Sequence, residues 1–182
     1  MGMNERARRI WERLPSPARD AAKKGWAGYA RLTARGRLLP DYLIIGTQRG
    51  GTTSLYKYLT RHPSLAHALT KELRFFDLNY DKGMAWYRSR FPSRRYKQLV
   101  RRTRGVELVV GEGSPDYMFH PHAPGRIART LPSAKLIVFL RNPVDRAWSH
   151  YWHQHSRGHE PLSFDEAVLR EPERLAGELE KM

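Results

Sequence analysis

The sequence predicts an α/β fold, a three-layer sandwich of helices around a mainly parallel central sheet. Short apolar runs typical of buried parallel strands recur along the chain, and each is followed by a loop and then a helical pattern. Prolines stand at the ends of several of these patterns, where they stop or start helices. Hydrophobic residues make up 40% of the 182 residues, which is enough apolar material for one packed core. This composition excludes wholesale disorder.

Residues 1–39 are expected to form a basic helical lead-in to the α/β domain, which is expected over residues 40–182. The lead-in is rich in Lys and Arg, and we expect short, loosely attached helices because Pro15 and Pro17 interrupt any continuous helix. The domain then alternates strands and helices. In chain order we expect strand 42–45, helix 52–61, strand 108–111, helix 124–131, strand 135–140, helix 144–155 and one or two helices after Ser163.

Two of these elements have further expected features. The strand over 135–140 is expected to be buried in the sheet, like the two strands before it. The aromatic side chains Trp148, Tyr151 and Trp152 are expected to pack the helix that follows it onto the sheet.

The chain contains no cysteine, which excludes disulfides, thiolate zinc sites and a cysteine nucleophile. No apolar run approaches the roughly 20 residues of a membrane span, and the charged first 40 residues show no signal peptide. We therefore expect a soluble protein of a reducing compartment, the cytoplasm, without an integral membrane segment.

The formal net charge of +15 points to an anionic partner. Basic residues concentrate in residues 1–40 and again in 88–104, a stretch without any Asp or Glu. Such clusters can meet nucleic acid, membrane headgroups or an acidic polysaccharide. No recognisable nucleic-acid-binding motif accompanies them, so no nucleic-acid partner is expected.

The most informative segment is the glycine-rich loop 46–54 between the first strand and the first helix of the domain. Glycines let successive backbone N–H groups point at one anion, and the helix N-terminus adds its dipole. The spacing of Gly46 and Gly51 resembles G-x-x-x-x-G-K-[ST], but Thr52 stands where nucleoside-triphosphate enzymes have lysine. The cation is Arg49, inside the loop. This P-loop-type turn therefore fits a single phosphate group better than a triphosphate.

A second candidate anion site follows the strand at 135–140. Arg141 lies at the carboxyl end of that strand, where open α/β sheets bind ligands. Ser149 follows about two helical turns later and can reach the same phosphate if the helix runs back past the loop. Taken singly, Arg141 also fits a surface ion pair with Asp145, and Ser149 also fits a solvent-facing hydroxyl.

Together the two elements resemble the sulfotransferase family that uses 3′-phosphoadenosine 5′-phosphosulfate (PAPS). The loop is similar to that family's 5′-phosphosulfate loop, and Arg141 with Ser149 to its 3′-phosphate motif. Segments 71–87 and 111–117 are similar to the branch that sulfates heparan-type glycosaminoglycans. The resemblance covers about residues 40–172 and rests on four motifs in order.

The resemblance implies a role for each matching residue. Arg49 stands where the family has a lysine over the bridging oxygen of the phosphosulfate, and Glu72 matches the general base. Arg141 and Ser149 match the pair that binds the 3′-phosphate. The residues implied to hold the 5′-phosphate are Gly50, Gly51, Thr52, Thr53 and Ser54, with Arg49 beside them. The co-substrate implied is PAPS, with no metal.

The implied reaction is sulfuryl transfer to a hydroxyl or amine, with a carbohydrate or glycan as the expected acceptor and a lipid or other small molecule as alternatives. Gly113 stands where glycosaminoglycan members carry a lysine. If Glu72 is not the base, the candidates are Asp77, Glu112 and His67.

Family members continue beyond this length, so we expect a truncated chain with an incomplete sheet, marginal stability and little activity alone.

Two other functions stay open at the level of the sequence. A P-loop nucleotide-binding or kinase-like protein would bind ATP, and Thr52 in the lysine position counts against it. A basic non-enzymatic nucleic-acid-binding protein would show salt-sensitive DNA binding without any response to the nucleotide product.

Overall fold

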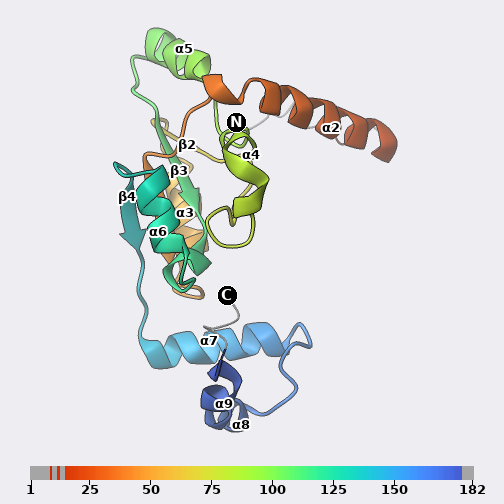
Figure 1. Ribbon diagram of the computed structural model, residues 1–182, viewed down its shortest axis with the longest axis vertical. Helices are drawn as coiled ribbons and strands as arrows, with labels where there is room; N and C mark the ends of the chain where they lie inside the picture. Colours follow the sequence, from red (N-terminus) through yellow and green to blue (C-terminus); the bar gives the residue numbers. More distant parts are fainter. Residues whose placement is uncertain (1–8, 10–11, 13–14, 178–182) are drawn as a thin grey trace.

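The computed structural model describes residues 9, 12 and 15–177, and it confirms an α/β fold (Figure 1). A four-stranded parallel sheet in the order β2-β3-β1-β4 forms its centre. The strands are β1 (Tyr42–Gly46), β2 (Leu65–His67), β3 (Val109–Gly113) and β4 (Lys135–Val138). The α-helices within the described ranges are α2 (Ser16–Leu32), α3 (Thr52–Leu59), α4 (Gly83–Arg88), α5 (Arg94–Arg104), α6 (Ala123–Thr130), α7 (Pro143–His155), α8 (Phe164–Leu169) and α9 (Glu171–Leu175).

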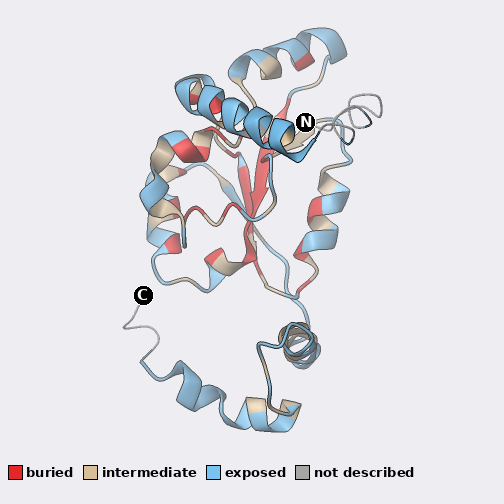
Figure 2. Cartoon of the chain, turned by 90° about the vertical axis from the view of Figure 1, so that its right-hand side faces the viewer, coloured by how far each residue is buried: buried red, intermediate tan, exposed pale blue. Residues whose placement is uncertain are grey.

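Side chains of the central strand β1 alternate between two apolar layers, which gives the predicted three-layer arrangement. Tyr42 and Ile44 pack with Tyr56 of α3 on one face. Leu43 points to the other face, where the larger cluster lies under α4 and α6. Figure 2 shows the burial concentrated in the strands and in the helix faces turned toward them.

The larger layer is built mainly from aromatic rings. Phe75 stacks on Tyr87 with ring centroids 4.2 Å apart, and Phe76 meets Tyr117 edge to face at 5.4 Å. All four rings are at most 1% exposed. This cluster fixes the segment that follows β2, because Phe75 and Phe76 lie within it.

The sequence prediction located every strand but β2, and most helix ends agree within two residues. Three expectations disagree with the structure, and two helices were not expected. The prolines of the lead-in begin one 17-residue helix, α2, because proline is tolerated in a first helical turn. Helices α4 and α5 were not predicted.

The expectation of a buried strand at 135–140 is wrong, because β4 is the edge strand of the described sheet and Leu136 is 52% exposed. The expected packing of α7 on the sheet is also wrong. Trp148 meets Phe164 of α8 edge to face, with ring centroids 4.9 Å apart, and none of the residues of α7 is buried. No helix in the described part of the chain is both long and apolar enough to cross a membrane.

Candidate functional site

The loop between β1 and α3 lies directly on the end of β4. Thr47 N–H donates to the Phe139 carbonyl at 3.0 Å, so the loop continues the pairing of the two strands. A Cβ at Gly50 would lie 2.6 Å from that same carbonyl oxygen, and Gly51 has a φ of +106°. Both positions therefore require glycine for this tight turn.

The turn leaves a set of backbone donors at the start of α3. The N–H groups of Gly51, Thr52 and Thr53 have no acceptor among the residues that the structure describes. Those of Gly50 and Ser54 are already bonded, to Thr47 and Gly51 carbonyls at 2.9 and 3.0 Å. The predicted phosphate loop therefore offers three N–H groups and the helix dipole to one anion, while Ser54 contributes only its hydroxyl.

The two predicted anion-binding elements meet, although about a hundred residues separate them in sequence. Arg49 donates from Nε and Nη2 to the hydroxyl of Ser149, at 3.1 and 3.0 Å. Arg141 Nη1 approaches the Arg49 carbonyl at 3.5 Å. Arg49, Arg141 and Ser149 therefore border one site at the carboxyl ends of β1 and β4.

Glu72 reaches the same site from the segment after β2. Its neighbour Lys71 donates from Nζ to the Thr53 hydroxyl at 3.0 Å and forms an ion pair with Glu72. The Glu72 side chain is 44% exposed, so solvent or a substrate can reach it. Lys71 was not assigned a role from the sequence, although it stands in the quoted motif next to Glu72.

Glu72 and Arg74 both have positive φ, at 59° and 51°, a conformation that residues with a Cβ adopt only when their surroundings hold them there. Three hydrogen bonds hold this segment. Glu72 N–H donates to the Gly113 carbonyl at 3.1 Å, Arg74 N–H to the Ser114 hydroxyl at 3.1 Å, and Phe75 N–H to the Tyr117 hydroxyl at 2.7 Å.

Glu112 lies behind these bonds and is fully buried. Its carboxylate accepts from the hydroxyls of Ser114 at 2.9 Å, Tyr117 at 2.6 Å and Tyr87 at 2.5 Å. Because the Ser114 and Tyr117 hydroxyls each accept a backbone N–H, their own protons are left for Glu112. Glu112 thus holds the backbone of residues 74–75 through two hydroxyl groups.

Burial raises the pKa of Glu112, and the three hydroxyl donors oppose that rise.

The lack of exposure of Glu112 excludes it as a base for an external substrate. Asp77 is also excluded on this ground, since its side chain is 0% exposed and paired with Arg74 at 2.8 Å. His67 Nδ1 lies 2.8 Å from the Ala68 carbonyl, and its ring packs on Tyr56 at 5.6 Å. Among the four carboxyl and imidazole candidates, Glu72 has the contacts with the site.

His153 is a further member of the site that the sequence did not identify. Its Nδ1 accepts from Nη1 of Arg49 at 3.3 Å. Desolvation lowers the pKa of His153, and the positive charges of Arg157 and Arg49 lower it further. The spacing of Ser149 and His153, four residues apart on α7, is the signal that could have found it. No group of three potential metal ligands occurs among the residues the structure describes.

A family model described as "Sulfotransferase domain" matches residues 39–174. The chain belongs to the sulfotransferase family. A sulfotransferase structure from Alicyclobacillus acidocaldarius shares the fold with a TM-score of 0.58 and 36% identity, over 76% of this chain and 59% of that one.

Two curated relatives are similar to this sulfotransferase-family chain at nearly equal levels. The bifunctional heparan sulfate N-deacetylase/N-sulfotransferase 4 of Mus musculus is 39% identical over 138 residues, which is 72% of this chain and 14% of the relative. The heparan sulfate glucosamine 3-O-sulfotransferase 6 of Homo sapiens is 38% identical over 136 residues, 74% of this chain and 36% of the relative. The match therefore spans a minor part of each relative's length.

Gly113, where the resemblance leads us to expect lysine, has a structural explanation. A Cβ there would lie 3.2 Å from Cδ2 of Tyr56, closer than side chains normally pack. Tyr56 is buried in the layer between α3 and the sheet. A lysine at this position would have to displace that ring.

Proposed function

We propose that this protein transfers a sulfuryl group from PAPS to a hydroxyl or amine of a carbohydrate acceptor. The observation that carries the proposal is the contact of Arg49 with Ser149, which joins the glycine-rich loop to the Arg141 segment. A donor with phosphate groups at both its 5′ and 3′ positions needs two neighbouring anion-binding elements, and a nucleoside triphosphate does not. Thr52, in the lysine position of triphosphate enzymes, is buried.

The residues present fit the donor. Gly51, Thr52 and Thr53 offer a 5′-phosphate three N–H groups that have no acceptor among the described residues, and Gly50 and Gly51 permit the tight turn that exposes them. Arg141 and Ser149 would hold the 3′-phosphate by charge-assisted hydrogen bonds. Arg49, which belongs to the loop and contacts Ser149, would stand between the two phosphate groups. When bound, PAPS supplies the activated sulfuryl group.

Glu72 accepts the proton of the acceptor hydroxyl or amine as the new bond to sulfur forms. At the same time the bond between sulfur and the bridging oxygen breaks, and the electron pair goes to the 5′-phosphate. Arg49 and the N–H groups of the loop stabilise the negative charge that develops there. Lys71, bonded to Thr53 and paired with Glu72, orients the base beside the loop.

The names of the two relatives, a heparan sulfate N-deacetylase/N-sulfotransferase and a heparan sulfate glucosamine 3-O-sulfotransferase, support a carbohydrate acceptor. This chain has Gly113 at the position where the members that act on glycosaminoglycans carry a lysine, so it lacks that positive charge. We therefore propose the class of acceptor, a carbohydrate with a free hydroxyl or amine, and no particular glycan.

Replacing Glu72 by Gln tests the assignment of the base. Turnover with PAPS and a panel of glycans, measured by transfer of labelled sulfate, should fall about 10²- to 10⁴-fold. Affinity for the product 3′-phosphoadenosine 5′-phosphate (PAP) should stay unchanged, because Glu72 lies on the acceptor side. The control Glu173→Gln alters an exposed carboxylate on α9 and should change neither quantity. Full turnover in the Glu72→Gln variant would remove Glu72 from the mechanism.

A further inference from the structure

The described part of the first basic segment, residues 15–40, comes together with the second, residues 88–104, at one end of the molecule. Helices α2 and α5 lie at the end opposite α7 and the loop 46–51 (Figure 1). Leu38 N–H donates to the Pro92 carbonyl at 2.9 Å, and Arg37 forms an isolated bridge with Ser93, which joins the end of the lead-in to the start of α5. This basic end faces away from the proposed sulfuryl-transfer site.

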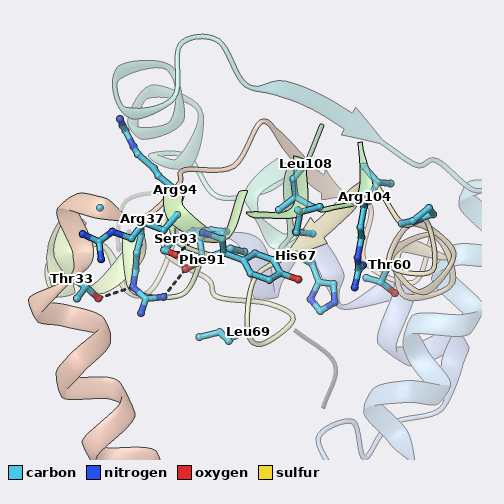
Figure 3. A pocket seen from close by; sticks show the side chains of 18 of the residues that line it. Thr33, Arg37, Thr60, His67, Leu69, Phe91, Ser93, Arg94, Arg104 and Leu108 are labelled. Atoms are coloured by element: carbon cyan, nitrogen blue, oxygen red, sulfur yellow. Dashed lines mark hydrogen bonds between the residues drawn. The ribbon is translucent and has the colours of Figure 1, made fainter. Parts of the chain in front are cut away.

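A cavity of about 880 Å³ opens at this end, between α2, α5 and the connection from α3 to β2 (Figure 3). Its size is within the range of small-molecule and headgroup sites. No Asp or Glu occurs among the described residues that line it. The cations in its wall are Arg37, Arg61, Arg94, Arg95 and Arg104.

Arg37 is a buried cation without a counter-charge among the residues that the structure describes. It is only 6% exposed, and its guanidinium donates to the Phe91 carbonyl at 2.8 Å and the Thr33 hydroxyl at 3.2 Å, as drawn in Figure 3. It also lies 5.2 Å from the ring centroid of Trp26. None of these partners is negative, and desolvation lowers the pKa of Arg37. Buried charges in proteins are normally paired, so this one indicates an external anion.

The other arginines of the cavity wall also have no acidic partner among the described residues. Within the described ranges, Arg61, Arg94, Arg95 and Arg104 form no ion pair, and all four are exposed. Arginine forks suit phosphate oxygens, which they contact in pairs. Several unpaired arginines around one opening favour a phosphate-bearing surface as partner.

Apolar side chains stand on the same rim. Trp26, Tyr29 and Leu32 follow one another at three-residue spacing along α2, and they are 41%, 61% and 89% exposed. All three also line the cavity, which places them beside the arginines. Trp and Tyr are the side chains that membrane interfaces favour, and an exposed Leu gains free energy only in an apolar phase.

We propose that this end of the molecule docks on a bilayer containing anionic phospholipids. The arginines contact headgroup phosphates, Arg37 supplies a fixed charge at the base of the cavity, and Trp26, Tyr29 and Leu32 enter the interface. Charge complementarity alone would also suit nucleic acid or an acidic polysaccharide. The exposed aromatic and aliphatic row favours a bilayer, because a polysaccharide or phosphate backbone offers Leu32 no apolar phase.

Co-sedimentation of the full chain with vesicles tests the docking. Binding should be strong to phosphatidylcholine vesicles that contain phosphatidylserine, weak to phosphatidylcholine alone, and weaker in high salt. The double variant Arg94→Gln, Arg95→Gln should bind the anionic vesicles about 30-fold less, because each basic residue near such a surface contributes about fivefold. The matched control Arg129→Gln, Arg170→Gln removes two exposed arginines elsewhere and should bind as the wild type does.

Leu32→Gln provides the second test, because Leu32 is exposed and its replacement keeps a good helix former. It should weaken vesicle binding about tenfold or more, as expected for loss of a buried Leu side chain. Vesicle binding that depends on neither Arg94 and Arg95 nor Leu32 would overturn the proposal. Binding to single-stranded DNA or dextran sulfate without binding to anionic vesicles would overturn it as well. Unchanged vesicle binding in the Leu32→Gln variant would also overturn it, even if the arginine variant binds less.

Discussion

At the scale of single residues, Glu112 holds the backbone segment that carries Glu72 in position. Its carboxylate is fully buried and lies apart from the proposed donor site. The two hydroxyl groups that donate to it, those of Ser114 and Tyr117, also accept hydrogen bonds from the N–H groups of residues 74 and 75. Two residues in this segment have positive φ, so the backbone depends on those bonds. The position of the proposed base is therefore determined by a buried polar network.

Replacing Tyr117 by Phe should destabilise the fold by about 1–3 kcal/mol, because Glu112 and the Phe75 N–H would each lose a buried partner. Urea unfolding measures the change. Tyr58→Phe serves as the control, since Tyr58 is 68% exposed and should change stability by less than about 0.5 kcal/mol. Equal stability of the two variants would show that the network does not hold the segment.

His153 predicts a pH dependence of PAP binding. Desolvation and the neighbouring arginines keep its pKa low in the free protein. An anion bound at Arg49 would raise that pKa, so binding takes up a proton, and affinity should increase as the pH falls through the interval between the free and bound pKa. Calorimetric titration at several pH values measures this.

The ligand phosphate also titrates, near pH 6, and this works in the opposite direction. The variant His153→Asn keeps a polar side chain that does not titrate, so its pH profile contains only the contribution of the ligand phosphate. The difference between the wild type and this variant is then the contribution of His153. The wild type should gain affinity relative to His153→Asn as the pH is lowered. Parallel pH profiles for the two proteins would contradict the assignment.

At the scale of elements, the sequence predicted what local patterns determine and missed what only packing determines. The runs at β1 and β3 are apolar and buried, so periodicity was sufficient. Strand β2 has three residues, too few to show a pattern. The apolar run at β4 was predicted as buried because sequence alone does not show that no described element covers Leu136 and Val138.

The candidate site divides in the same way. The loop and the Arg141 segment are continuous motifs with recognisable spacing, and the structure brings them together through Arg49 and Ser149. Lys71 and His153 escaped prediction because their partners in the site lie 18 and 104 residues away in sequence. The Glu112 network escaped prediction because its bonds to the segment of Glu72 span 40 and 42 residues. Such contacts depend on the tertiary fold and leave no local signal.

The loop itself can be tested with a pair of glycine substitutions. Gly50→Ala places a Cβ 2.6 Å from a backbone carbonyl, so the loop must shift. PAP affinity should fall by about tenfold or more, as for loss of one charge-assisted hydrogen bond. Gly25→Ala in α2 meets no atom within 4 Å and should leave PAP binding unchanged while stabilising the fold by about 0.5–1 kcal/mol. Undiminished affinity in Gly50→Ala would exclude the loop from the binding site.

At the scale of the whole molecule, the described structure separates two regions of positive charge. One lies at the carboxyl ends of β1 and β4, where Arg49 and Arg141 meet Ser149. The other lies at the opposite end, around the cavity between α2 and α5. A net charge of +15 is therefore not spread evenly, and the two proposals, nucleotide binding and membrane docking, can be tested with separate variants.

The central claim is that the glycine-rich loop and the Arg141 segment form one site for a nucleotide with two separate phosphate groups. Titration calorimetry of wild type and Arg141→Ala with PAP and with adenosine 5′-phosphosulfate, which has no 3′-phosphate, tests it most directly. Affinity for PAP should fall roughly 10- to 150-fold, since a charge-assisted contact contributes about 1.5–3 kcal/mol, while affinity for adenosine 5′-phosphosulfate stays nearly constant. Equal losses for the two ligands, or no loss for PAP, would contradict the claim.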